Sequence, residues 1–430
     1  MTTKHVAIFV FPGYGHVNPT LEISRCLIAL GHRVSYMLDE GLAAPVTAIG
    51  AEVVRYTSRR GRLGAGPVTG EDIGALGLTF LRESMEVILP RTLESFEDDV
   101  PDLLLYDLES FFTARTAAKR WGRPTAQLFP YVAANEHYAL ALEVFDGAGE
   151  NMGKCIDLMT RHLTAEGADP DTATSFLANF DERNVVLLPR AFQPLGETFD
   201  DRYTFTGHSL PADRPGTGSW SRPAGEGPAG EGPAGDGPVA LITLGTEVND
   251  RPDFFRTCVE AFDGSGWHLV MSVGPGNLPA CRAATGNAAN AELHEWLAFN
   301  TVLPHVSAVV CHAGISTMLE AISFGKPLVV ITYTPEDRVN GRRTVDLGLG
   351  VELPGHEVTA ARLREAVETV ARSPYIRRQV ARMRMDMLAA GGPARAAQLV
   401  DGWLKEPFRP AERTASPTAA PAALERANAR

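Results

Sequence analysis

A histidine stands in the middle of a glycine-containing turn near the start of the chain. The turn, Phe-Pro-Gly-Tyr-Gly-His-Val-Asn-Pro-Thr at residues 11–20, follows an apolar run and precedes a segment with helical spacing. Histidine suits general-base chemistry because its unperturbed pKa lies near neutrality, but it needs a carboxylate to orient it. Asp107 is the predicted partner of His16, with Asp102 and Glu109 as alternatives. The competing interpretation of Asp107 is a helix N-cap.

A second group of polar residues lies in the other half of the chain. His312 and Gly314 follow a strand-like run, and Ser316, Thr317 and Glu320 stand at the start of a predicted helix. A helix N-terminus presents free N–H groups and a partial positive charge, so hydroxyls and a histidine placed there favour a diphosphate site. Glu320, about one turn further on, could hold ribose hydroxyls. A capped helix with a buried histidine is an equally good interpretation of the spacing alone.

Strand-like and helix-like segments alternate in both halves of the chain. Short links between them indicate parallel, doubly wound α/β sheets. Asn18 is the expected N-cap of the first helix, with Pro19 at its first position and Gly31 at its end. The strand-like runs lie at residues 5–11, 32–38, 51–56, 102–107, 123–129, 239–245, 268–274, 308–314 and 327–333.

A stretch rich in proline and glycine at residues 211–238 divides the two halves. Its repeated Pro-Ala-Gly-Glu-Gly cannot build a core, which predicts a flexible linker or long surface loop. The sequence therefore predicts one α/β domain at 1–210 and a second at 239–405. The tail at 406–430 is rich in alanine, proline and arginine and is expected to be disordered.

The carboxyl ends of the predicted strands carry most of the polar candidates. In open parallel sheets, ligands bind beyond these ends, so two such sets facing one another across a cleft would make a two-substrate site. The residues at strand ends are Gly13 to His16, Asp39, Glu40 and Asp107 in the first half, and Gly245, Thr246, Gly274, His312 to Thr317 and Pro335 to Asp337 in the second.

Composition narrows the class of protein. A formal net charge of −12 argues against a nucleic-acid partner, because phosphate binding needs a basic face. No apolar run reaches the roughly 18 residues of a membrane span, and the start does not resemble a signal peptide. Five dispersed cysteines without a Cys-x-x-Cys pair indicate reduced thiols in the cytoplasm and no zinc site.

Several motifs, in the same order along the chain, resemble those of family 1 glycosyltransferases. Trp296, the run His-Ala-Gly-Ile-Ser-Thr-Met-Leu-Glu-Ala at 312–321 and Tyr-Thr-Pro-Glu-Asp-Arg-Val-Asn at 333–340 are similar to the family's donor-sugar signature. Over about residues 4–405 the chain looks like a bacterial macrolide-type glycosyltransferase. The resemblance implies a GT-B fold of two Rossmann-like domains facing a central cleft. The N-terminal one would bind the acceptor and the C-terminal one the nucleotide sugar, with the last helix packing back on the N-terminal domain.

The resemblance also implies roles for single residues. Trp296 would stack on a uracil or thymine base, His312 and Thr317 would contact the diphosphate, Glu320 would hold the ribose, and Glu336 would bind sugar hydroxyls. It further implies that His16 and Asp107 form the catalytic dyad. The donor site implied in this way comprises Gly245, Thr246, Trp296, His312, Gly314, Ser316, Thr317, Glu320, Glu336 and Asp337.

Three positions depart from the family's pattern. Ala298 and Phe299 replace the Pro-Gln that follows the tryptophan, Ser316 replaces an asparagine, and Asp337 replaces a glutamine. A carboxylate in place of an amide loses two hydrogen-bond donors and adds a charge. The departures therefore leave the donor open between UDP-linked and dTDP-linked sugars, deoxysugars included.

Two other functional classes compete with this interpretation. An NAD(P)-dependent oxidoreductase could use the Gly13/Gly15 turn with Asp39 as a ribose-binding acid, but Asn18 replaces the third glycine of that motif. A non-catalytic module that binds sugar nucleotides is the other alternative, and the His16–Asp107 pair argues against it. A metal is not expected, because the Asp-Pro-Asp at 169–171 follows no strand.

The sequence thus predicts an inverting O-glycosyltransferase without a cofactor or required metal. Its partners would be a nucleotide sugar and a bulky apolar aglycone such as a macrolide, polyketide or flavonoid-like alcohol. It would have no nucleic-acid partner and no membrane span, and a homodimer is compatible with all of this. The acceptor pocket is expected to include Phe80, Met85, Phe111 and Tyr131.

Overall fold

The computed structural model describes residues 3–59, 61, 68–144, 149–167, 180–209, 220–221 and 237–407. The chain divides into two compact units. The N-terminal unit comprises Met1–Gly61, Thr69–Ala212 and Ala389–Arg430, and the C-terminal unit comprises Arg62–Val68 and Asp213–Leu388. The Asp-Pro-Asp at 169–171, most of the 211–238 segment and the tail beyond 407 lie outside the described residues.

The N-terminal unit is built on a seven-stranded, fully parallel sheet. Its strand order is β3-β2-β1-β4-β5-β6-β7, so the order reverses between β1 and β4. This is the doubly wound arrangement expected from the alternating pattern. The strands are β1 His5–Phe9, β2 Arg33–Asp39, β3 Glu52–Tyr56, β4 Leu103–Tyr106, β5 Thr125–Phe129, β6 Asn184–Val186 and β7 Tyr203–Phe205.

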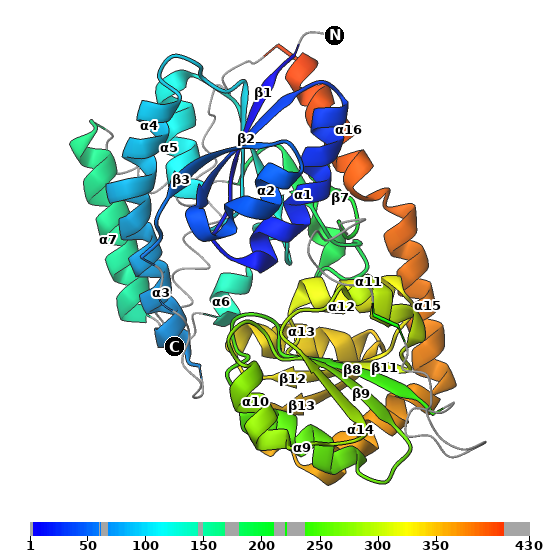
Figure 1. Cartoon of the computed structure of the whole chain (residues 1–430). Helices are drawn as coiled ribbons and strands as arrows, with labels where there is room; N and C mark the ends of the chain where they lie inside the picture. The colour runs from blue at the N-terminus through cyan, green and yellow to red at the C-terminus, as the bar shows by residue number, and fades with distance from the viewer. Residues whose placement is uncertain are drawn as a thin grey trace. The chain divides into compact units, whose positions relative to one another are not determined.

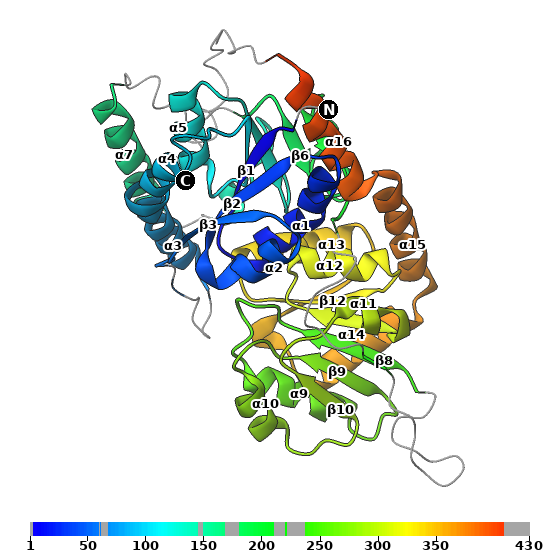
Figure 2. The ribbon, with the colours of Figure 1, turned by 45° about the horizontal axis from the view of Figure 1, so that its top comes forward.

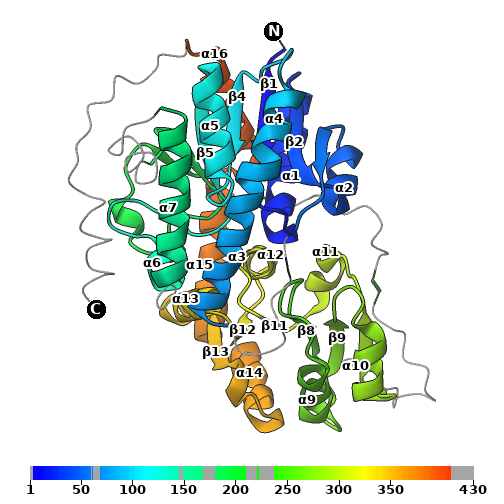
Figure 3. The same cartoon turned by 90° about the vertical axis from the view of Figure 1, so that its left-hand side faces the viewer.

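Helices cover both faces of this sheet, and α3 and α7 lie side by side (Figure 3). A five-residue π-helical turn, Ser84–Ile88, joins α3 to α4. The α-helices of the N-terminal unit are α1 Tyr14–Ala29, α2 Ala43–Ala48, α3 Gly70–Glu83, α4 Leu89–Ser95, α5 Phe111–Trp121, α6 Leu140–Val144, α7 Gly149–Ala165 and α16 Gly392–Lys405.

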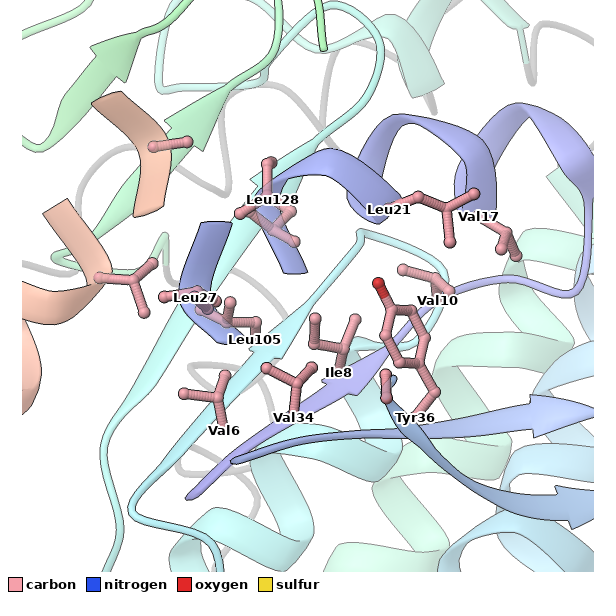
Figure 4. Close-up of a cluster of buried hydrophobic side chains, with 14 of the residues drawn as sticks. Val6, Ile8, Val10, Val17, Leu21, Leu27, Val34, Tyr36, Leu105 and Leu128 are labelled. Carbon is pink, nitrogen blue, oxygen red and sulfur yellow. The ribbon is translucent and has the colours of Figure 1, made fainter. Parts of the chain in front are cut away.

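The central strands are apolar along their whole length because both faces of the sheet are covered. Side chains alternate along β1, so Val6 and Ile8 join one core cluster while Ala7 and Phe9 join the other. Figure 4 shows the first cluster, in which Val6 and Ile8 lie among side chains of neighbouring strands and of α1. The second cluster packs against α3, α4, α5 and α7.

The last helix of the chain completes the first of these clusters. α16 packs along α1 (Figure 1), and its residues Ala396, Ala397 and Val400 are fully buried there. His32 and Asp401 add a polar contact of 3.1 Å beside this apolar seam. A helix about 370 residues away in sequence is therefore part of the core that supports β1 and α1.

The first helix begins earlier than the sequence predicts. α1 starts at Tyr14, with Gly13 as its N-cap, and the Gly13 carbonyl accepts from the His16 and Val17 amides at 3.0 Å each. Pro19 therefore lies inside the helix, and the predicted start at Asn18 and Pro19 is wrong. Because α1 begins at Tyr14, His16 stands in its first turn.

The C-terminal unit contains a six-stranded parallel sheet of the same kind. Its order is β10-β9-β8-β11-β12-β13, and it reverses between β8 and β11. The strands are β8 Val239–Thr243, β9 His268–Ser272, β10 Ala291–His294, β11 Ala308–Cys311, β12 Leu328–Thr332 and β13 Gly350–Pro354. Figure 2 labels β8, β9, β10 and β12 of this sheet.

α9 contacts both α10 and α14, so these three helices cover one face of that sheet. The α-helices of this unit are α9 Pro252–Phe262, α10 Leu278–Thr285, α11 Phe299–Val302, α12 Ile315–Ser323, α13 Pro335–Asp346, α14 Ala360–Arg372 and α15 Pro374–Ala389. No helix in the described part of the chain has the length and apolarity needed to cross a bilayer.

One residue of the segment between the two sheets is anchored in the C-terminal unit. Trp220 is 8% exposed, and its indole N–H donates to Glu292 at 3.1 Å. His268 and His294 also contact the Glu292 carboxylate. Although burial alone would raise the pKa of Glu292, these three hydrogen bonds hold it at about 2. Glu292 is thus a charged anchor for Trp220.

Replacing Val400 with alanine is expected to destabilise the N-terminal unit by about 2 kcal/mol, because two buried methyl groups leave a cavity against α1. Chemical denaturation followed by circular dichroism would measure the loss. Gln398→Ala on the exposed side of the same helix is the control and should change stability little. Equal effects of the two substitutions would contradict the role given to α16.

Candidate functional site

The point where each sheet reverses its strand order is where the predicted chemical residues gather. Phe9 at the end of β1 pairs with Tyr106 at the end of β4, so the segments that follow them leave the sheet side by side. Thr243 of β8 and Cys311 of β11 are paired in the same way. His16 and Asp107 follow the first pair of strands, and Gly245 and His312 follow the second.

His16 and Asp107 are in direct contact. The imidazole Nδ1 lies 2.8 Å from Asp107 Oδ2, and Asp107 is fully buried while the His16 side chain is 20% exposed. The same carboxylate accepts the backbone N–H of Phe11 at 2.7 Å and that of Ser110 at 3.0 Å. The sequence-predicted pair is therefore brought together, and backbone amides from two loops hold its carboxylate in place.

Of the alternative partners for His16, Asp102 is wrong and Glu109 is a close neighbour. Asp102 precedes β4, at the opposite end of the strand, where it binds Lys4 and the backbone N–H of His5. Glu109 Oε2 lies 3.8 Å from His16 Nδ1, further than Asp107 does. The Tyr131 hydroxyl donates to Glu109 Oε2 at 2.7 Å.

Glu109 is held in an environment that favours its neutral form. Desolvation raises its pKa to about 7, and the Asp107 carboxylate adds to the rise, while His16 and the Tyr131 hydroxyl oppose it. The side chain is still about a third exposed, at 36%. Two carboxyl groups, the buried one of Asp107 and the partly exposed one of Glu109, thus flank one imidazole.

The predicted acceptor residues surround this group without all meeting at one point. The Tyr131 ring lies edge-on to His16, with centroids 5.5 Å apart, and Phe80 contacts Phe11 in the same manner at 4.9 Å. Met85 lies in the π-helical turn and packs, half-buried, against the core. Phe111 is the first residue of α5. The contacts neither confirm nor exclude an acceptor role for these four, so the role stays a prediction.

Phe11 belongs to the site, although the sequence interpretation did not assign it a role. Its ring lies between His16, at 5.2 Å between centroids, and Phe80, while its backbone N–H binds Asp107. The available signal was its place at the end of the first apolar run, directly before the glycine turn.

In the C-terminal unit, His312 lies in a slot between two glycines. A Cβ atom on Gly245 or on Gly314 would fall 2.3 or 2.4 Å from His312 Cε1, so no other residue fits at either position without displacing the ring. Burial lowers the pKa of His312 to about 4, which leaves the imidazole neutral at pH 7. Its Nδ1 is buried and has no hydrogen-bond partner within the described residues.

The start of α12 lies next to this histidine. Gly314 is its N-cap in an extended conformation, and no side chain caps the first turn. Ser316 and Thr317 therefore stand in that turn beside free backbone N–H groups, as the sequence predicts for an anion site. Glu320 lies further along the same helix and is only 4% exposed.

The turn after β8 is held by an unpredicted chain of side-chain amides. The Asn249 Nδ2 donates to the Gly245 carbonyl at 2.7 Å, and Asn277 in turn donates to Asn249 at 2.9 Å. Gly245 has a φ of 68°, a left-handed conformation that glycine adopts readily. Thr246 follows it and is half-buried.

The remaining donor candidates have separate surroundings. Trp296, just beyond β10, is 42% exposed, which leaves its ring accessible to a planar ligand. Glu336 lies in the first turn of α13.

Asp337 has a structural role that the sequence interpretation missed. Its buried carboxylate accepts the Tyr333 and Thr334 amides and forms a capping box with Thr334.

One group of side chains has the spacing of a metal site. Among the described residues, ligand atoms of His16, Asp107 and Glu109 lie within 4.8 Å of one another. The donor set fits poorly with a metal, because His16 Nδ1 and two backbone amides already take the Asp107 carboxylate. A divalent ion at this place would compete with the hydrogen bond that orients His16.

Comparison with known proteins agrees with this geometry. Residues 277–401 match the family model described as erythromycin biosynthesis protein CIII-like, C-terminal domain. The chain is 34% identical to demethyllactenocin mycarosyltransferase of Streptomyces fradiae, covering 93% of this chain and 86% of that protein. It is 32% identical to oleandomycin glycosyltransferase of Streptomyces antibioticus, covering 94% and 91%.

This chain belongs to the macrolide-type family 1 glycosyltransferases. The solved structure of the calicheamicin glycosyltransferase CalG4 is 35% identical and superposes with a TM-score of 0.78, covering 94% of this chain and 99% of that one. The glycosyltransferase is therefore an enzyme with the two-domain α/β fold predicted from its sequence. The membership also removes the nicotinamide oxidoreductase and the non-catalytic module from consideration.

Replacing Glu109 with glutamine is expected to stabilise the glycosyltransferase at pH 8 but not at pH 5. The native pKa of about 7 lies above the ordinary value of 4.5, so the native state favours the protonated form. Stability from this group is then present below pH 4.5 and lost as the pH rises through 7. Because glutamine cannot ionise, the variant keeps this stability at high pH.

Thermal unfolding at the two pH values would measure the difference. Glu197→Gln, at an exposed position, is the control, and its effect on the melting temperature should be the same at both pH values. A change in melting temperature of the same size at both pH values would contradict the environment assigned to Glu109.

Proposed function

We propose that this protein is an inverting O-glycosyltransferase. It would move a sugar from a UDP- or dTDP-linked donor to a hydroxyl of a bulky, apolar natural product such as a macrolide, polyketide or flavonoid-like compound. The observation that carries the proposal is the 2.8 Å contact between His16 Nδ1 and the buried Asp107 carboxylate. The relatives act on acceptors of this kind by name, namely demethyllactenocin and oleandomycin.

The His16–Asp107 contact supports a general-base role through the tautomer that it favours. A carboxylate at Nδ1 holds the ring proton on that atom and leaves the Nε2 lone pair free to accept the proton of an acceptor hydroxyl. The imidazolium that forms is stabilised by the Asp107 carboxylate. The deprotonated oxygen would then attack the anomeric carbon directly, and the nucleoside diphosphate would leave from the opposite face.

The donor side would stabilise the charge on the departing diphosphate. Free N–H groups of the first turn of α12, the hydroxyls of Ser316 and Thr317 and the His312 ring are the groups proposed to bind it. Trp296 would stack on the base, Glu320 would hold the ribose, and Glu336 would bind sugar hydroxyls. Gly245 and Thr246 would approach the phosphates. These roles need no metal and no cofactor.

We also propose that the enzyme works in the cytoplasm. Its five cysteines are all unpaired, as expected of a reducing compartment. A nucleotide sugar and a small-molecule aglycone would be its substrates.

Replacing His16 with alanine is expected to lower kcat/KM for transfer by about 10²–10⁴-fold, the usual contribution of a general base. A discontinuous assay of glycosylated product, with circular dichroism to show that the fold is kept, would measure the loss. His356→Ala, at an 82% exposed side chain of the C-terminal unit, is the matched control. Transfer at the wild-type rate by a folded His16→Ala protein would exclude the mechanism.

The donor class can be found by thermal stabilisation with UDP, dTDP and their sugars. A ligand present at about 100 times its Kd stabilises the native state by about 2.7 kcal/mol, so the melting temperature should rise by several degrees. The rise should persist in EDTA, because no metal is proposed, and NAD(P) should give none. If no nucleotide raised the melting temperature, the donor site would be wrong.

A further inference from the structure

The residue next to His312 has an unusual backbone conformation. Ala313 has a φ of 61°, and among the described residues only Leu195 is another non-glycine with a positive φ. An L-residue in this region costs about 1 kcal/mol relative to glycine, and it persists only when the surroundings enforce it. Ala313 is fully buried between β11 and α12, so the strain lies at the start of the proposed donor site.

One side chain from another helix holds this turn. Asn340 of α13 donates from Nδ2 to the Ala313 carbonyl at 3.0 Å, across 27 positions of sequence. Asn340 is 2% exposed, so this hydrogen bond is shielded from water. A buried carbonyl without a hydrogen-bond donor is destabilising. If Ala313 relaxed to an ordinary conformation, its carbonyl would lose the Asn340 donor, so this hydrogen bond opposes the relaxation.

The orientation of His312 depends on that turn. The ring lies in the slot between Gly245 and Gly314, and Gly314 directly follows Ala313. A change in the φ of Ala313 would move Gly314 relative to the ring and would also redirect the first N–H groups of α12. Nδ1 of His312, buried without a partner in the described structure, points to a ligand contact for this ring.

We propose that Asn340 is a positioning residue of the donor site. Its amide holds the left-handed turn at Ala313, and this turn sets His312 and the start of α12 in place for a nucleoside diphosphate. Asn340 acts through Ala313 and does not touch the donor. The inference rests on the proposed function, since it deepens the description of that same donor site.

A thermodynamic cycle of two substitutions separates this role from simple packing. Asn340→Ala removes the amide that holds the turn. Ala313→Gly makes that support unnecessary, because glycine adopts a positive φ without strain. Binding of UDP and dTDP would be measured by calorimetry for the wild type, both single variants and the double variant. Donor KM and acceptor KM would be measured alongside.

Asn340→Ala should weaken nucleotide binding by about 5–30-fold, the equivalent of one lost buried hydrogen bond, and should raise donor KM but not acceptor KM. Ala313→Gly alone should stay within about threefold of wild type. The double variant should recover most of the lost affinity. Asn290→Ala is the matched control, because Asn290 also donates an amide to a backbone carbonyl, that of Phe262, at 3.0 Å. It should leave binding unchanged.

Three results would overturn the inference. Wild-type affinity in Asn340→Ala would show that the amide is not needed, and a double variant as weak as Asn340→Ala would show a packing role only. If the wild-type protein bound neither nucleotide, the proposed function would itself fail and the inference with it. Should Asn340→Ala not fold, Asn340→Leu, which keeps the shape of the side chain and removes its donor, takes its place with the same expected outcomes.

Discussion

The hydrogen-bonded pairing of β1 with β4 is the constraint on which the proposed chemistry depends. It aligns Phe9 with Tyr106, so that the turn carrying His16 and the turn carrying Asp107 emerge together from the centre of the sheet. The pairing of β8 with β11 repeats the arrangement in the second unit and brings Gly245 to His312. In a doubly wound sheet the helices leave in opposite directions at these points, which opens space for a ligand.

Each unit has a histidine in the segment that follows a central strand, His16 after β1 and His312 after β11. The different surroundings of the two rings give them different properties. His16 is partly exposed, and its Nδ1 lies against a buried carboxylate. His312 has no charged partner in the described structure, and burial keeps it neutral. A neutral ring beside a helix N-terminus can donate a hydrogen bond to a phosphate while the ring itself carries no charge. The same side chain is thus proposed as a base in one unit and as a ligand contact in the other.

Much of this arrangement is readable from the sequence, for identifiable physical reasons. Nine strand-like runs became strands, and most of these strands are apolar because both of their faces are buried. β6, β7, β10 and β13 were not predicted. They are short or lie at sheet edges, where partly exposed side chains weaken the pattern. Pro19 misplaced the start of α1, since proline at a first helical position is commoner than proline inside a helix.

The parts of the site that the sequence did not reveal come from contacts between distant residues. Asp107 was chosen correctly over Asp102, because only the residue after a strand reaches the ligand end of the sheet. The support given by Asn340 to Ala313 and by Asn249 to Gly245 could not be foreseen, because such amides carry no periodic signal. Asp337 shows the converse, because its capping role was missed although the local Thr-x-x-Asp spacing is the signal for it.

The configuration of the glycosidic bond in the product tests the central claim most directly. Proton NMR of the anomeric signal, with a donor of known α configuration, reports whether the acceptor oxygen attacks in a single displacement. The account predicts a β-linked product, because an oxygen activated by His16 enters opposite the departing diphosphate. An α-linked product would contradict direct attack and would require a covalent intermediate or attack from the same face as the departing diphosphate.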